Sequence, residues 1–157
     1  MEVYKNILTN DFCDTLIEKV KNECVLSESH KINWFVWLIW GQQSSQSLDG
    51  EKWNEKIYNS VTNELIKCNF PEYKIMWLQM TEYEDGRWLR RHVDGAANKT
   101  SIILLSDEFM GGDTYINDTV VNLKKGDAVL FNGGYEFHEI KAVTKGTRYA
   151  LNFWFYK

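Results

Sequence analysis

Residues 147–156 read Thr-Arg-Tyr-Ala-Leu-Asn-Phe-Trp-Phe-Tyr, and two kinds of side chain alternate along this stretch. Successive residues of a β-strand point to opposite faces of the sheet. One face is wholly apolar and has to be covered by other parts of the chain; it consists of Tyr149, Leu151, Phe153 and Phe155. The other face is mixed; it consists of Arg148, Ala150, Asn152 and Trp154. The stretch predicts a strand with one side in a hydrophobic core and the other lining a ligand cavity.

Short strands separated by turns also fill the chain before this stretch. β-Branched and aromatic residues recur in short runs, and Gly, Asn and Asp mark the turns between them. The expected strands cover residues 74–83, 89–94, 100–105, 113–116, 119–123, 128–131, 138–143 and 147–156. Gly111-Gly112 and Gly133-Gly134 are expected to allow tight turns with positive φ. A series of short strands with these turns predicts a β-sandwich or jelly-roll barrel.

Two amphipathic helices are expected to precede the strands. Thr9-Asn10-Asp11 offers an N-cap to a helix over residues 11–23, and apolar residues at helical spacing predict a second helix over residues 51–68. Between them, residues 32–40 predict a strand and residues 41–50 a polar loop. The expected fold class is α+β, mainly β, a jelly roll braced by N-terminal helices. We expect one domain over residues 1–157, with mostly supporting helices in 1–70 and the β core in 74–157.

Charge and composition narrow the classes of partner. The net charge of −4 gives no general attraction to nucleic-acid phosphates, although a local basic cluster leaves an anionic partner open; it comprises Arg87, Arg90, Arg91 and Lys99. The longest apolar run, residues 34–40, is far shorter than the roughly 20 residues that cross a bilayer, so no membrane partner is expected. The N-terminus lacks a signal-peptide pattern, and the three cysteines lack zinc-ribbon or disulfide spacing. A cytoplasmic location with reduced thiols is expected.

The candidate metal ligands are His92, Asp94 and His138. In a strand, residues i and i+2 point the same way, so the side chains of His92 and Asp94 can converge on one ion. His138 opens another expected strand and can complete a site of two nitrogens and one oxygen. Two histidines and one carboxylate leave three open positions on an octahedron, which is typical of non-haem Fe(II) oxygenases. Catalytic zinc sites use similar ligands and remain the competing interpretation.

Arg148 helps to decide between the two metals. It lies on the mixed face of the last expected strand, where a planar guanidinium can bind a carboxylate in bidentate fashion.

Five motifs occur in one order along the chain: Arg91-His92-Val93-Asp94, Gly111-Gly112-Asp113-Thr114, residues 125–131 (Lys-Gly-Asp-Ala-Val-Leu-Phe), His138, and residues 146–151 (Gly-Thr-Arg-Tyr-Ala-Leu). Over residues 74–157 the sequence resembles the prolyl-hydroxylase branch of the 2-oxoglutarate/Fe(II) oxygenase superfamily. The resemblance implies a double-stranded β-helix that uses Fe(II), 2-oxoglutarate and O2.

The resemblance also assigns roles to individual residues. It implies that His92, Asp94 and His138 bind iron and that Arg148 binds the distal carboxylate of 2-oxoglutarate. Tyr83 resembles a tyrosine of the cosubstrate pocket, and Trp88 is either a neighbouring pocket residue or a core aromatic. The sequence departs from the family pattern at Ile103-Leu104, where a second cosubstrate-binding tyrosine is usual, and at Asn152, where threonine is usual.

The activity that this resemblance implies is hydroxylation of a C–H bond, with release of succinate and CO2. The branch favours a prolyl residue in a peptide or protein as the substrate. Oxidation of a nucleobase or a free amino acid by the same chemistry is an alternative, although Trp154 stands where nucleic-acid demethylases have a second arginine. A non-catalytic jelly-roll binding module is the other alternative, and the presence of all three ligands and the arginine counts against it.

Overall fold

The computed structural model describes residues 1–23, 27–28, 46–49, 55–67, 70–71, 74–95 and 97–156 of the chain. Two helices lie in these ranges, α1 (Asn10–Glu23) and α3 (Glu55–Lys67). The strands are β1 (Glu2–Tyr4), β2 (Ser27–Glu28), β3 (Gln46–Asp49), β4 (Ile75–Tyr83), β5 (Leu89–His92), β6 (Lys99–Leu104), β7 (Phe109–Gly111), β8 (Thr114–Ile116), β9 (Thr119–Val121), β10 (Ala128–Phe131), β11 (His138–Ile140), β12 (Val143–Gly146) and β13 (Arg148–Phe155). Neither helix is long and apolar enough to span a bilayer.

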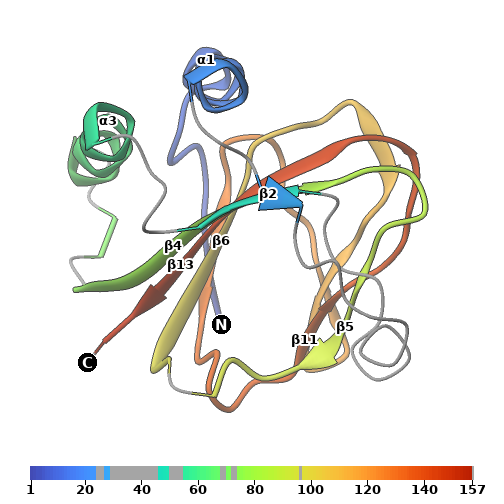
Figure 1. Cartoon of the computed structure of the whole chain (residues 1–157). Helices are drawn as coiled ribbons and strands as arrows, with labels where there is room; N and C mark the ends of the chain where they lie inside the picture. The colour runs from blue at the N-terminus through green and yellow to red at the C-terminus, as the bar shows by residue number, and fades with distance from the viewer. Residues whose placement is uncertain are drawn as a thin grey trace.

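The described strands form antiparallel sheets that face one another across a jelly-roll interior (Figure 1). The large sheet has the order β1-β10-β6-β13-β4-β3-β2, and the small sheet has the order β5-β11-β8-β9. A separate pair joins β12 to β7. β13 lies between β4 and β6. Its apolar face packs in the core with the helices, so its mixed face looks toward the small sheet. This arrangement confirms the expected mainly β, jelly-roll fold class.

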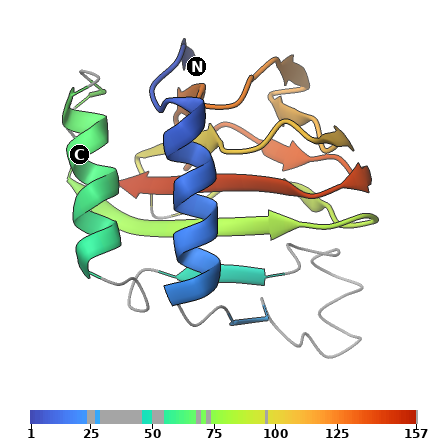
Figure 2. The same cartoon turned by 90° about the horizontal axis from the view of Figure 1, so that it is seen from above.

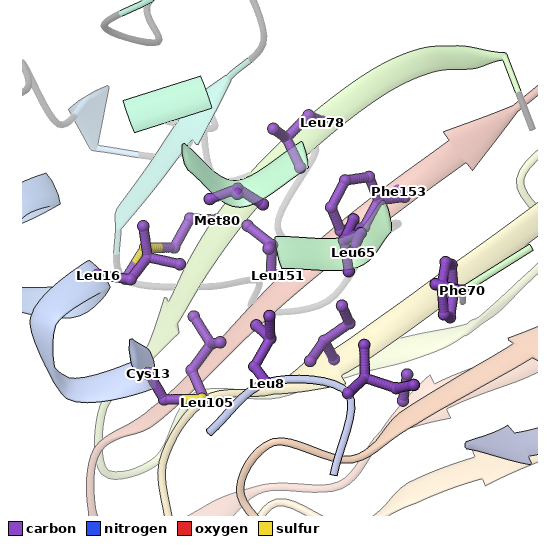
Figure 3. Close-up of a cluster of buried hydrophobic side chains, with 14 of the residues drawn as sticks. Leu8, Cys13, Leu16, Leu65, Phe70, Leu78, Met80, Leu105, Leu151 and Phe153 are labelled. Carbon is purple, nitrogen blue, oxygen red and sulfur yellow. The ribbon is translucent and has the colours of Figure 1, made fainter. Parts of the chain in front are cut away.

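Both helices pack on the outer face of the large sheet (Figures 1 and 2). The helix that begins at Asn10 is capped as expected, because the backbone N–H of Phe12 donates to Thr9 Oγ1 at 3.2 Å. Its buried stripe consists of Cys13, Leu16 and Val20. These side chains meet the apolar face of β13 in one core, drawn in Figure 3. The predicted alternation along β13 is confirmed: Leu151, Phe153 and Phe155 are fully buried on the helix side.

Some expected boundaries are wrong, and each error has a local cause. Residues 46–49, expected within a polar loop, form β3, because hydrogen bonding to β4 makes a strand without an apolar pattern. The strand expected over 138–143 is two strands, β11 and β12, with Lys141 and Ala142 between them. β1 and β7 were not expected; each has only three residues. The strand expected over 32–40 lies outside the described residues.

Asp127, in the Lys-Gly-Asp motif before β10, holds the N-terminal segment against the sheet. Its side chain is buried. Lys5 Nζ and the backbone N–H of Lys124 both donate to Oδ2 at 2.9 Å, and the N–H of Asn6 donates to Oδ1 at 3.0 Å. A buried carboxylate is stable in a fold when its oxygens are saturated in this way. The acidic residue of the motif therefore has a structural role.

Replacing Asp127 with alanine is expected to lower the free energy of unfolding by about 3 kcal/mol, because three hydrogen bonds to a charged group are lost. Burial raises the pKa of Asp127, but Lys5 and the N–H groups of Asn6 and Lys124 lower it more, so its pKa lies below the usual value. The carboxylate therefore stabilises the fold above the unfolded pKa of about 3.9 and loses this effect as pH falls through the folded pKa. Urea unfolding should show a difference in the free energy of unfolding between wild type and Asp127→Ala, and this difference should become smaller below about pH 4.

Asp107→Ala is the matched control, because Asp107 is exposed and its nearest cation, Lys125, lies 3.9 Å away. Such a surface pair contributes less than about 1 kcal/mol. Equal destabilisation by the two substitutions would contradict the proposed role of the Asp127 carboxylate. So would an effect of Asp127→Ala on the free energy of unfolding that does not change with pH.

Candidate metal centre

The three candidate ligands meet at one end of the barrel interior, where β5 ends and β11 begins. His92 and His138 are direct antiparallel partners in the small sheet. Nε2 of each histidine lies 3.4 Å from Oδ1 of Asp94. The candidate ligand atoms all lie within 4.8 Å of one another, and in the described part of the chain this is the one group of His, Cys, Asp or Glu side chains with such geometry.

Asp94 reaches this position from a turn. We expected it to share a strand with His92, but β5 ends at His92. The backbone N–H of Asp94 donates to the carbonyl of Gly133 at 2.8 Å, which fixes the turn against the loop before β11. The i, i+2 argument therefore identified the correct pair of residues but gave the wrong local geometry for Asp94.

Both imidazoles are oriented by backbone carbonyls. Nδ1 of His92 lies 2.8 Å from the carbonyl of Arg90, and Nδ1 of His138 lies 3.1 Å from the carbonyl of Glu136. A carbonyl only accepts, so each Nδ1 carries the proton and donates. With the proton on Nδ1, the neutral form of such a ring presents the lone pair of Nε2 to the centre, which is the tautomer that metal ligands require.

The electrostatics of the centre favour a cation. Burial raises the pKa of Asp94, but hydrogen bonds with His138 and His92 lower it more, and the pKa is held well below its usual range. Burial lowers the pKa of His92, but Asp94 and the carbonyl of Arg90 outweigh burial and raise it overall. Two imidazole nitrogens and one ionised carboxylate oxygen, all directed to one point, suit a divalent metal with open positions.

The candidate metal centre opens into a cavity between the two sheets. It is lined by Gln79, Tyr83, Leu89, His92, Asp94, Thr100, Ile102, His138, Ile140, Arg148, Asn152 and Trp154. The mixed face of β13 therefore lines a cavity, as its alternation predicted. Tyr83 is the direct partner of Arg148 across β4 and β13. Trp88 does not line the cavity.

Arg148 is the largest fully buried side chain among the described residues, with 1% of its surface exposed. Its Nη2 donates to Thr114 Oγ1 at 3.0 Å, and the guanidinium carbon lies 5.6 Å from the centre of the Tyr83 ring. No carboxylate of the described residues forms an ion pair with it. Burial lowers the pKa of Arg148, against the opposing effect of Tyr83 and Asp113, yet guanidinium remains protonated in proteins. The cavity thus contains a buried cation that needs an anion.

Sequence analysis missed the residues that hold Arg148. Nothing about Thr114 by itself indicated a contact with Arg148, although it is the last residue of the Gly111-Gly112-Asp113-Thr114 motif. A Cβ placed on Gly112 would lie 3.0 Å from Cδ of Arg148 and 3.1 Å from Cγ2 of Val143. The second glycine of the motif therefore leaves room for the aliphatic part of Arg148, and the hydroxyl of Thr114 accepts a hydrogen bond from its guanidinium.

A jelly roll that gathers two histidines and one aspartate around a cavity with a buried arginine defines the class of non-haem iron oxygenases. The model of the 2OG-Fe(II) oxygenase superfamily matches residues 78–156, and the chain belongs to this superfamily. The cofactor and cosubstrates of this superfamily are Fe(II), 2-oxoglutarate and O2, and the donor set described above fits them.

Two curated relatives are PKHD-type hydroxylases. A PKHD-type hydroxylase of Delftia acidovorans is 30% identical over 99 residues, which cover 52% of this chain and 43% of the relative. A PKHD-type hydroxylase of Acinetobacter baumannii is 44% identical over 52 residues, covering 31% of this chain and 22% of the relative. The chain thus spans less than half the length of the curated relatives it matches.

Solved structures share the fold at low identity. A prolyl-4-hydroxylase of Pseudomonas putida superposes with a TM-score of 0.71 at 18% identity, covering 99% of this chain and 91% of the other. The viral collagen prolyl hydroxylase of Paramecium Bursaria Chlorella virus-1 superposes with a TM-score of 0.68 at 17% identity, covering 98% and 93%.

Proposed function

We propose that this protein is an Fe(II)- and 2-oxoglutarate-dependent dioxygenase that hydroxylates a C–H bond of a prolyl residue in a peptide or protein, with release of succinate and CO2. The observation that carries the proposal is the buried Arg148, which shares one cavity with the three metal ligands. A buried charge without a counter-charge is costly, so such a residue is retained where a ligand supplies the counter-charge.

The cavity suits a small dicarboxylate. One carboxylate pairs with the guanidinium of Arg148, and the opposite end of the molecule faces the metal ligands. Thr114 fixes one nitrogen of the guanidinium at 3.0 Å and leaves the rest of the fork for the ligand. Burial raises the pKa of Tyr83, against the opposing effect of Arg148, so its hydroxyl stays protonated and can donate to the same carboxylate.

In the proposed reaction, His92, Asp94 and His138 hold Fe(II), and Arg148 with Tyr83 orients the 2-oxoglutarate. Bound iron and 2-oxoglutarate supply the oxidising chemistry that uses O2 to hydroxylate the substrate. The hydrophobic side chains Leu89, Ile102 and Ile140 line the cavity between the sheets and make part of its wall apolar. The chain needs no nucleophile or acid–base pair of its own for this chemistry.

A prolyl substrate is supported by the names of the related proteins and by aromatic residues at the cavity. Trp154 lines the cavity, and its direct partner across the large sheet, Trp77, is 38% exposed. Aromatic surfaces of this kind bind proline-containing segments, which adopt a preformed extended helix.

The oxygenase proposal is tested by anaerobic titration of metal-free protein with Fe(II) and then 2-oxoglutarate. A weak visible absorption band is expected when the keto acid is added to wild type, and it should be lost in His138→Ala, because one of the two nitrogens that hold the metal is removed. Folded wild-type protein that binds iron without this band would favour a binding module or another metal.

The substrate proposal is tested by succinate release in the presence of peptides. A proline-containing peptide should stimulate release and gain one oxygen atom by mass spectrometry, and the same peptide with alanine in place of proline should do neither. Stimulation by a methylated oligonucleotide or a free amino acid, with no response to prolyl peptides, would overturn the prolyl substrate and leave the oxygenase assignment intact.

A further inference from the structure

The two oxygens of the Asp94 carboxylate have different surroundings. Oδ1 lies 3.4 Å from Nε2 of both histidines. Oδ2 points away from them and accepts a hydrogen bond from Thr100 Oγ1. Only one oxygen of the ligand therefore faces the centre.

Thr100 is fixed independently of Asp94. It belongs to β6, pairs with Trp154 of β13 and Phe131 of β10, and has 2% of its surface exposed. A β-branched residue in the middle of a sheet has little rotational freedom. The hydroxyl of Thr100 is thus a rigid donor at the back of the carboxylate.

Gly133 lies against both Thr100 and Asp94. A Cβ on this residue would overlap Oγ1 of Thr100 and lie 2.5 Å from Oδ2 of Asp94. The carbonyl of Gly133 also accepts the N–H of Asp94 at 2.8 Å. A side chain at position 133 would disrupt the hydrogen bond between Thr100 and Asp94. This requirement accounts for the glycine in the loop before β11.

We propose that Thr100 is a positioning residue that keeps Asp94 a ligand through one oxygen only, with Gly133 providing the room. A carboxylate that turned to bind through both oxygens would occupy a further metal position, and two positions would remain for cosubstrates in place of three. Outer partners of this kind orient a ligand and tune its affinity. The inference rests on the metal site of the proposed function.

The test compares T100V with T100S in metal-free protein. Valine keeps the shape of threonine and removes the hydroxyl, whereas serine keeps the hydroxyl. Mn(II) affinity, measured from the electron paramagnetic resonance signal of free Mn(II), is expected to fall about 10- to 100-fold in T100V and to stay near wild type in T100S. The visible spectrum of the Co(II)-loaded protein, which reports coordination number, should change in T100V and not in T100S.

Each outcome decides a separate point. Wild-type protein that binds no Mn(II) would overturn the metal site and this inference with it. Wild-type affinity and an unchanged Co(II) spectrum in T100V would overturn the role of Thr100 and leave the metal site intact. Thermal unfolding of the metal-free variants checks folding; if T100V is unfolded, T100A provides the same comparison, and weakened Mn(II) binding in folded Gly133→Ala supports the arrangement from the other side.

Discussion

Asp94→Ala protein is expected to show no iron-dependent turnover of 2-oxoglutarate above background. The carboxylate is the one negative charge among the three ligands, and both imidazoles lie 3.4 Å from its Oδ1. Loss of outer partners of a metal ligand already costs about 10- to 100-fold in affinity, so loss of the ligand itself is expected to cost at least about 100-fold. Succinate formation with saturating Fe(II) measures the activity, and Mn(II) titration measures the affinity.

Asp11→Ala is the control for this variant, because Asp11 is exposed in the first turn of α1, on the outer side of the large sheet. It should leave turnover unchanged. Full turnover by Asp94→Ala would refute the site as a whole.

Arg148→Leu is expected to weaken 2-oxoglutarate binding by about 100-fold or more. Each charge-assisted hydrogen bond to the carboxylate contributes about 1.5–3 kcal/mol, and a tenfold change corresponds to about 1.4 kcal/mol. Arg148→Lys keeps the charge but loses the planar fork, so an intermediate loss is expected. The affinity is measured by titrating Mn(II)-loaded protein with 2-oxoglutarate.

Arg148→Leu should not destabilise the ligand-free protein. Without a ligand, the guanidinium is a buried cation that has one hydrogen bond to Thr114 and no ion pair among the described residues. Replacing such a charge with a hydrophobic residue is often neutral or stabilising. Wild type should gain thermal stability when 2-oxoglutarate is added, and Arg148→Leu should not. The control is Arg87→Leu, because Arg87 does not line the cavity. An equal gain in thermal stability in wild type and Arg148→Leu, or an equal loss of 2-oxoglutarate binding in Arg87→Leu, would contradict the role of Arg148.

The buried and exposed faces of the strands and helices could be predicted because apolar residues recur at regular spacing along the sequence. The alternation from Arg148 to Phe155 indicated which side of β13 meets the helices and which lines the cavity, and both predictions are confirmed. The helix that begins at Asn10 followed from its apolar spacing and its cap at Thr9. The second helix was predicted over 51–68 and is described from Glu55 to Lys67. These signals are local, so neighbouring residues suffice to reveal them.

The residues that complete the site were missed because their contacts join distant parts of the chain. Gly133 was expected to have positive φ, and this prediction is wrong. Glycine is needed there because a side chain would overlap Thr100 and Asp94. Thr114 meets Arg148 only because β8 faces β13 across the barrel. Ile103 and Leu104, where the resemblance led us to expect a second cosubstrate-binding tyrosine, are both buried, and neither lines the cavity. No pattern within a single strand encodes such pairings.

The direct pairing of His92 with His138 also bears on how the two sheets differ in strength. β5 has four residues and β11, β8 and β9 have three each, whereas β13 has eight and β4 has nine. A metal held at the end of the short strands acts as a cross-link within the weaker sheet, and its binding free energy adds to the folding free energy of that sheet. We therefore expect the stability of the small sheet to depend on bound metal more than that of the large sheet does.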